Sequence, residues 1–174
     1  ELFRALGFER FTIRINDRRV LTGVLDHLGL VERQTDVLRV LDKLGKIGAE
    51  KVTTELCDGV GLSADQAASV LEFAGLEGSP AEILAGAVPL VGESEVGTAG
   101  IESLTALFEC IEEAGADLGR FALDPSIARG LDYYTGVIFE TFLDDLPAIG
   151  SCCSGGRYDD LASLYTKEKL PGVG

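Results

Sequence analysis

The spacing of the apolar residues changes twice along this 174-residue chain, and these changes constrain the fold more than any other feature. Near the start, the stretch FTIRIN alternates apolar and polar side chains, which is typical of a half-buried strand. From about residue 35 to residue 114 the apolar residues recur mostly at helical spacing. After Gly119 short apolar runs return between turn residues. This order predicts an α+β sheet module interrupted by a helical insertion near residues 30 to 95.

Capping signals place several helix ends. Either residue of the pair Asn16–Asp17 can begin a helix that Gly29 ends. Ser63–Gln66 has the pattern of a capping box, and SPAE from Ser79 joins a cap to a proline at the first helical position. Further helices are predicted over residues 35–48, 49–59 and 101–114.

The last third of the chain predicts strands. The stretch RFALD is strand-like, and Val137–Leu143 is apolar on both of its faces. A strand of that kind lies inside a sheet and not at its edge. The following stretch, residues 150–165, mixes turn residues with a short apolar repeat.

The composition excludes several classes of protein. The longest apolar stretch, Ile83–Gly92, is too short to span a bilayer and contains a proline. No signal peptide or basic presequence is visible at the start, so we expect a soluble, cytoplasmic protein. The formal net charge of −14 argues against a broad nucleic-acid-binding surface, although it leaves a local basic patch open.

The four cysteines do not form a metal-binding pattern. None stands in a C-x-x-C pair, and His27 is the only histidine, so we expect no metal site. Cys152 and Cys153 are interpreted as small, buried, reduced residues. His27 is expected to be a surface or capping residue.

Both ends of the chain indicate a piece of a larger protein. The chain has no methionine, and ELFRAL reads as the end of a helix closed by Gly7 without any preceding cap. The final LPGVG ends in turn chemistry.

Two polar stretches stand out from the predicted sheet. RGLDYYTG, residues 129–136, joins an arginine, an aspartate and two tyrosines ahead of a strand, and SGGRYDD, residues 154–160, again joins glycines to an arginine and a tyrosine. Taken alone, each stretch has a plain interpretation as a turn. Together they indicate a polar pocket for a small anionic ligand, because glycines permit close approach and an arginine offers a rigid fork of donors.

The same two stretches resemble the histidine-binding signatures of the histidyl-tRNA synthetases, which are class II aminoacyl-tRNA synthetases. The first matches from Arg129 to Gly136 without a gap, and the second from Gly155 to Asp159. FTIRINDRRVL resembles the segment after the family's motif 2, and LDKLGKIG the start of its insertion domain. The resemblance implies catalytic-core segments at residues 1–29 and 96–174 around an insertion domain at residues 30–95.

The resemblance also implies a reaction. The histidine carboxylate attacks the α-phosphate of ATP, and the histidyl group of the adenylate then passes to the 3′ end of histidine tRNA. Arg129 matches the arginine beside the α-phosphate, where a fixed cation stabilises developing negative charge. ATP is therefore expected as a substrate, with Mg²⁺ accompanying it, although no Mg²⁺ ligands are identified in the sequence.

The family's histidine pocket maps onto the second tyrosine of one signature and the tyrosine of the other. Tyr134 matches the residue that recognises the imidazole, and Tyr158 matches the second phenol of the pocket. Two phenols can read both nitrogens of a neutral ring, because each can donate or accept a hydrogen bond. Gly155 and Gly156 are expected to let the ligand lie against the backbone. Tyr133, Asp132 and Arg157 are expected to support the residues that contact the ligand.

The resemblance implies partners and limits as well. A full-length parent is expected to bind histidine, ATP and histidine tRNA and to be a homodimer. Motifs 1, 2 and 3 and the anticodon-binding domain are expected outside these residues, so the chain alone is predicted to be inactive.

Alternatives to a working synthetase remain open. One is a catalytically silent paralogue, such as a regulatory subunit of the first enzyme of histidine biosynthesis or a sensor. Another is a helical interaction module with no site, which two intact signatures argue against. Glu140 is open between a carboxylate that supports the site and a solvated residue at a sheet edge.

Overall fold

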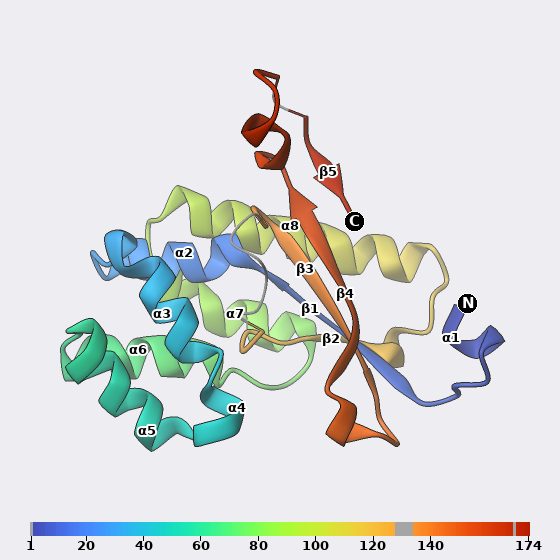
Figure 1. Ribbon diagram of the computed structural model, residues 1–174, viewed down its shortest axis with the longest axis horizontal. Coiled ribbons are helices and arrows are strands. Elements are labelled where there is room, and N and C mark those ends of the chain that lie inside the picture. Colours follow the sequence, from blue (N-terminus) through green and yellow to red (C-terminus); the bar gives the residue numbers. More distant parts are fainter. Residues whose placement is uncertain (1, 128–133, 169) are drawn as a thin grey trace.

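A five-stranded sheet forms the centre of the computed structural model, which describes residues 2–127, 134–168 and 170–174 (Figure 1). The strand order is β2-β1-β3-β4-β5. β1 pairs in parallel with β2, and the other neighbours are antiparallel. The strands are β1 (Phe11–Asp17), β2 (Phe121–Leu123), β3 (Val137–Leu143), β4 (Ser151–Tyr158) and β5 (Gly172–Val173).

Helices fill most of the chain between β1 and β2, which confirms the α+β class. The α-helices are α1 (Leu2–Ala5), α2 (Arg18–His27), α3 (Gln34–Leu41), α4 (Leu44–Ile47), α5 (Ala49–Thr54), α6 (Ala64–Ala74), α7 (Pro80–Val91) and α8 (Glu95–Glu113). Single turns are η1 (Val31–Arg33), the π-helical η2 (Glu55–Val60), η3 (Leu118–Arg120), η4 (Pro147–Ile149) and η5 (Leu161–Leu164). No helix within the described ranges combines the length and apolar character needed to cross a membrane.

The capping predictions are confirmed. Asp17 is the residue of its pair that begins α2, because its carboxylate accepts from the Arg19 amide. Ser63 and Ser79 each form a complete capping box at the start of α6 and α7. β3 lies between β1 and β4, as its two apolar faces predicted.

Some element boundaries were wrong. The helix predicted over residues 35–48 is two helices, α3 and α4, with a turn between them. The short helix predicted over residues 49–59 is helical to its end, although α5 gives way to the π-helical η2 after Thr54. α8 begins at Glu95, before its expected start, and much of the turn-rich stretch after residue 150 is the strand β4.

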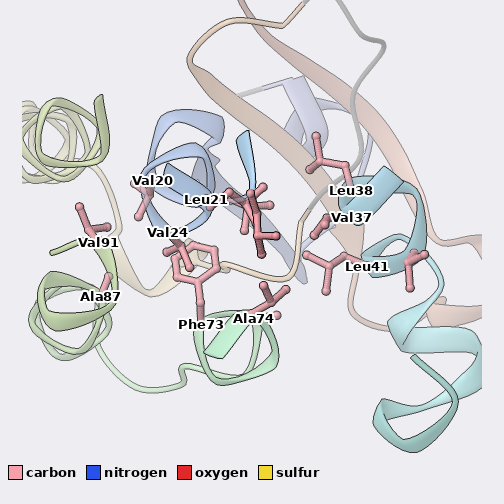
Figure 2. Packing of buried hydrophobic residues seen from close by; sticks show 14 of the residues in the cluster. Val20, Leu21, Val24, Val37, Leu38, Leu41, Phe73, Ala74, Ala87 and Val91 are labelled. Carbon is pink, nitrogen blue, oxygen red and sulfur yellow. The ribbon is translucent and has the colours of Figure 1, made fainter. Parts of the chain in front are cut away.

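One hydrophobic cluster joins the sheet to the helices. Ile15 of β1, Val24 of α2 and Leu104 of α8 are almost fully buried in it. Figure 2 shows Phe73 of α6 pointing toward Val24 of α2. The cluster also includes residues of α3 and α7, so the predicted insertion packs against the same core as the sheet. The division of the chain at residues 30 and 95 stays a prediction.

Three glycines, one in α2 and two in α8, allow these helices to touch through their backbones. A Cβ on Gly23 would collide with the Cα of Gly97, and one on Gly100 would lie 2.8 Å from the Val20 amide nitrogen. Gly97 and Gly100 lie in the first turns of α8, ahead of the apolar stripe that the sequence predicted. Glycine lowers helix propensity, yet here it permits an approach that a larger residue would block.

Gly97→Ala is therefore expected to destabilise the chain by about 1–3 kcal/mol, because the added methyl forces two helix backbones apart. Gly45→Ala in α4 is the matched control, since a Cβ there meets nothing within 4 Å. The free energies of unfolding in urea measure both. A Gly97→Ala protein as stable as the control would contradict the close packing.

Candidate functional site

The two faces of the sheet differ in chemistry. Ile13, Ile15 and Phe139 face the helices and pack on the hydrophobic cluster. Side chains alternate along a strand, so the neighbouring residues Arg14 and Glu140, which pair across β1 and β3, lie on the other face. We call this second face the polar face.

Tyr134 lies on the polar face, over a glycine of β4. A Cβ on Gly156 would sit 2.8 Å from Cδ1 of the Tyr134 ring. Gly156 is buried and pairs with Ile138 of β3. The absence of a side chain at Gly156 therefore makes room for the Tyr134 ring.

Tyr158 lies on the same face, against β5. Its ring is close to Gly172, where a Cβ would meet Cε2 at 2.5 Å, and its hydroxyl is near Gly174. Gly174 exchanges both main-chain hydrogen bonds with Gly156, at 2.8 and 3.2 Å. The two tyrosine rings consequently lie over neighbouring glycines of paired chain segments.

A direct link joins the two signature stretches. The Thr135 amide donates to the Arg157 carbonyl at 2.9 Å. The Thr135 hydroxyl donates to Oδ2 of Asp159, and the Asp159 amide donates back to that hydroxyl, both at 3.1 Å. The segment that carries Tyr134 is thereby fixed to the segment that carries Tyr158.

Charge also stabilises this link. Nε of Arg157 donates a hydrogen bond to Oδ2 of Asp159 at 3.1 Å and lies 3.0 Å from Oδ1. Its hydrogen bond lowers the pKa of Asp159 below the ordinary value, with smaller contributions from the Thr135 hydroxyl and the charge of Arg19. Asp159 therefore accepts the Thr135 hydrogen bond as a carboxylate at neutral pH.

A buried asparagine holds the chain on the entry side of the first signature. Asn16 is 3% exposed, and its amide nitrogen donates to the carbonyls of Pro125 and Ile127 at 3.3 and 3.1 Å. Its side-chain oxygen accepts from the Asp17 amide. Asn16 was considered only as a helix cap from the sequence, so this role was missed.

A second polar group lies farther along the polar face. Nη1 of Arg14 contacts Oδ2 of Asp124 at 2.9 Å, and its guanidinium lies 4.4 Å from the centre of the Phe142 ring. These residues and Glu140 line a hollow of about 300 Å³ that the α3–α4 corner closes on one side. Glu140 is 8% exposed on a central strand, so the interpretation as a solvated sheet-edge residue is wrong.

The remaining predicted residues have mixed outcomes. Arg129, Asp132 and Tyr133 lie outside the described residues. The carbonyl oxygen of Gly174 fills the space beside Gly155, where a Cβ would collide with it. Cys152 and Cys153 are exposed, so their interpretation as buried residues was wrong. β5 runs beside only the last residues of β4, from Gly156 onward. The start of β4, where both cysteines lie, has no strand of the described residues on that side.

The sequence interpretation missed Thr135 and Asp159 as partners, although both lie inside the signature stretches. His27 is exposed, as expected for a surface residue. Among the described residues, no three side chains of the histidine, cysteine, aspartate or glutamate type gather closely enough to hold a metal ion.

Comparison with known proteins identifies the family. The sequence pattern of the family described as "Histidyl-tRNA synthetase" matches residues 1–174. This chain belongs to the histidyl-tRNA synthetase family. The histidine–tRNA ligase of Rhodopirellula baltica is 54% identical over 173 residues, and that of Clostridium tetani is 42% identical over 174 residues. The chain spans only 39% of the length of each of these relatives.

Solved structures agree with this family membership. The histidyl-tRNA synthetase of Nostoc sp. PCC 7120 superposes with a TM-score of 0.92 at 36% identity, over 99% of this chain and 41% of that one. A Bacillus halodurans protein described as an ATP phosphoribosyltransferase regulatory subunit/histidyl-tRNA synthetase has a TM-score of 0.80 at 24% identity, over 98% of this chain and 43% of that one. The second likeness shows the fold alone.

The lowered pKa of Asp159 gives a prediction about acid stability. A carboxyl whose folded pKa is depressed stabilises the fold above its unfolded pKa of about 3.9, and this contribution is lost as pH falls through the folded pKa. Asp159→Asn should therefore lower the free energy of unfolding near pH 7, and its difference from the wild type should shrink below about pH 4.

Asp160→Asn is the matched control, because it removes a charge one residue away from the Arg157 and Thr135 contacts. Urea unfolding at a series of pH values measures both variants. If the Asp159→Asn difference does not change with pH, the Arg157–Asp159–Thr135 link does not depend on the carboxylate.

Proposed function

We propose that this chain is the histidine-reading part of the catalytic region of a histidine–tRNA ligase. The whole protein would activate histidine with ATP and transfer the histidyl group to histidine tRNA, as a homodimer in the cytoplasm. The observation that carries the proposal is the Thr135–Asp159 link, which joins the two signature stretches with Tyr134 and Tyr158 on the polar face.

The two phenols supply the chemistry for reading an imidazole. Tyr134 and Tyr158 lie over the paired segments around Gly156 and Gly174, so a planar ring between them could meet one hydroxyl at each nitrogen. A site that satisfies both nitrogens rejects an analogue lacking them, because its own polar groups would be left unpaired. Gly156 leaves the space that the Tyr134 ring occupies, so this ring can lie close to β4.

Arg129 is proposed as the catalytic cation. When the histidine carboxylate attacks the α-phosphorus of ATP, negative charge grows on the phosphate oxygens and pyrophosphate leaves. An arginine stays protonated throughout and offers several donors in a fixed plane, so it stabilises that charge without a proton transfer. The carboxylate of histidine needs no base, because it is already ionised at neutral pH.

Histidine-dependent ATP–pyrophosphate exchange by the full-length protein tests the activity. Arg129→Ala should lower kcat by about 100-fold or more, because removal of one such donor costs a factor of that order. Exchange in the wild type that is unchanged in Arg129→Ala would contradict the assigned role. Histidine binding without exchange in the wild type would instead identify a regulatory paralogue. The 174-residue chain alone is expected to show no exchange.

Tyr134→Phe should raise KM for histidine about 10- to 100-fold, since one imidazole nitrogen would lose its partner. Tyr165→Phe is the control, because Tyr165 is 86% exposed and lies in neither signature stretch. The exchange assay at varied histidine concentration measures both. Equal KM values for the two variants would exclude Tyr134 from histidine recognition.

A further inference from the structure

The main chain of Tyr134–Gly136 is held from two sides. On the β4 side, Thr135 makes the hydrogen bonds with Arg157 and Asp159 described above. On the other side stands Arg18, the first residue of α2. Arg18 lies outside both signature stretches, so their pattern does not point to this second contact.

Arg18 makes two hydrogen bonds that bracket Thr135. Its Nη1 donates to the Tyr134 carbonyl, and its amide donates to the Gly136 carbonyl, both at 3.2 Å. One residue thus fixes the carbonyl directions on both sides of Thr135. Since Thr135 is bound to β4 at the same time, the backbone that presents the Tyr134 ring has little freedom to rotate.

The position of Arg18 itself is set by elements that do not need its side chain. α2 begins at Asp17, a fully buried residue whose carboxylate caps the helix and pairs with Arg19 at 2.6 Å. The buried face of α2 is formed by apolar residues of the hydrophobic cluster. Arg18 instead borders a hollow of about 400 Å³ with Thr22 and Gln34. Replacing the Arg18 side chain therefore leaves the helix start and the core intact.

We propose that Arg18 is a positioning residue for histidine recognition. By holding the carbonyls of Tyr134 and Gly136, it keeps the Tyr134 ring over Gly156, from where the phenol meets the imidazole. The inference rests on the proposed function, because it concerns the same site. Arg18 acts through Tyr134 and makes no contact with the ligand of its own.

An arginine suits this role for a physical reason. Its charged N–H group forms a stronger hydrogen bond to a carbonyl than a neutral donor does. Its planar group is rigid, so the side chain loses little freedom when it binds. Lysine could reach the same carbonyl with a point charge, but it would fix the direction of the bond less well.

The exchange assay on the full-length protein distinguishes a residue that positions Tyr134 from one that only stabilises the fold. Arg18→Met keeps much of the length of the side chain and removes the donor. It should raise KM for histidine about tenfold and leave KM for ATP within about twofold, because only the histidine-reading tyrosine is displaced. Arg18→Lys should recover part of the loss. Arg39→Met is the control, since Arg39 lies on the exposed side of α3 and pairs with Asp36.

A double-mutant cycle supplies the decisive comparison. In the Tyr134→Phe background, Arg18→Met should change KM for histidine by less than about twofold, because the hydroxyl that it positions is already gone. A full tenfold effect in that background would overturn the proposal and indicate an independent role. Absence of any effect in the wild-type background would overturn it too.

Failure of the inference is distinguishable from failure of the proposed function. If the wild type shows no histidine-dependent exchange, the proposed function fails. If the wild type is active and Tyr134→Phe raises KM, while Arg18→Met behaves like Arg39→Met, only the positioning role fails.

Discussion

The antiparallel pairing of β1 with β3 is the constraint on which the rest of the structure depends. It runs over seven residue pairs, from Phe11 with Leu143 to Asp17 with Val137. Because side chains alternate, a slip of one residue would exchange the two faces of the sheet. The observed register sends Ile15 and Phe139 into the core and places Arg14 opposite Glu140 on the polar face.

The same register brings the end of β1 to the candidate site. Three consecutive residues there have different roles. Asn16 binds the turn at Pro125–Ile127, Asp17 caps α2, and Arg18 holds Tyr134. Residues more than 100 positions apart in the sequence are thereby joined by direct hydrogen bonds. The site is thus built on a strand end and a helix start, which are more rigid supports than a free loop.

The elements that local rules control were predictable from the sequence. Capping boxes at Ser63 and Ser79 depend on neighbouring residues alone, so their pattern was sufficient. β4 was missed as a strand because glycines and small residues have low strand propensity. Its glycines are explained only by distant groups, the Tyr134 ring at Gly156 and the Gly174 carbonyl at Gly155. The first turns of α8 were missed as helix because they pack on distant α2 through glycines and lack a local apolar stripe.

The ligand class and the contact residues of the candidate site were predictable from the sequence, but the hydrogen bonds that support these residues were not. Motif resemblance named Tyr134 and Tyr158, whereas the roles of Thr135 and Asp159 depend on a contact across 24 residues of sequence. Asn16 and Arg18 lie farther away still, and no local pattern connects them to the signatures. The exposed position of Cys152 and Cys153 was missed because it depends on where β5 ends along β4.

A crystal structure of the full-length protein with bound histidine tests the central claim most directly. We expect the imidazole between the Tyr134 and Tyr158 hydroxyls on the polar face, with the Thr135–Asp159 hydrogen bonds and the Arg18 contact to the Tyr134 carbonyl intact. Histidine bound elsewhere, or an imidazole that meets neither phenol, would contradict that claim.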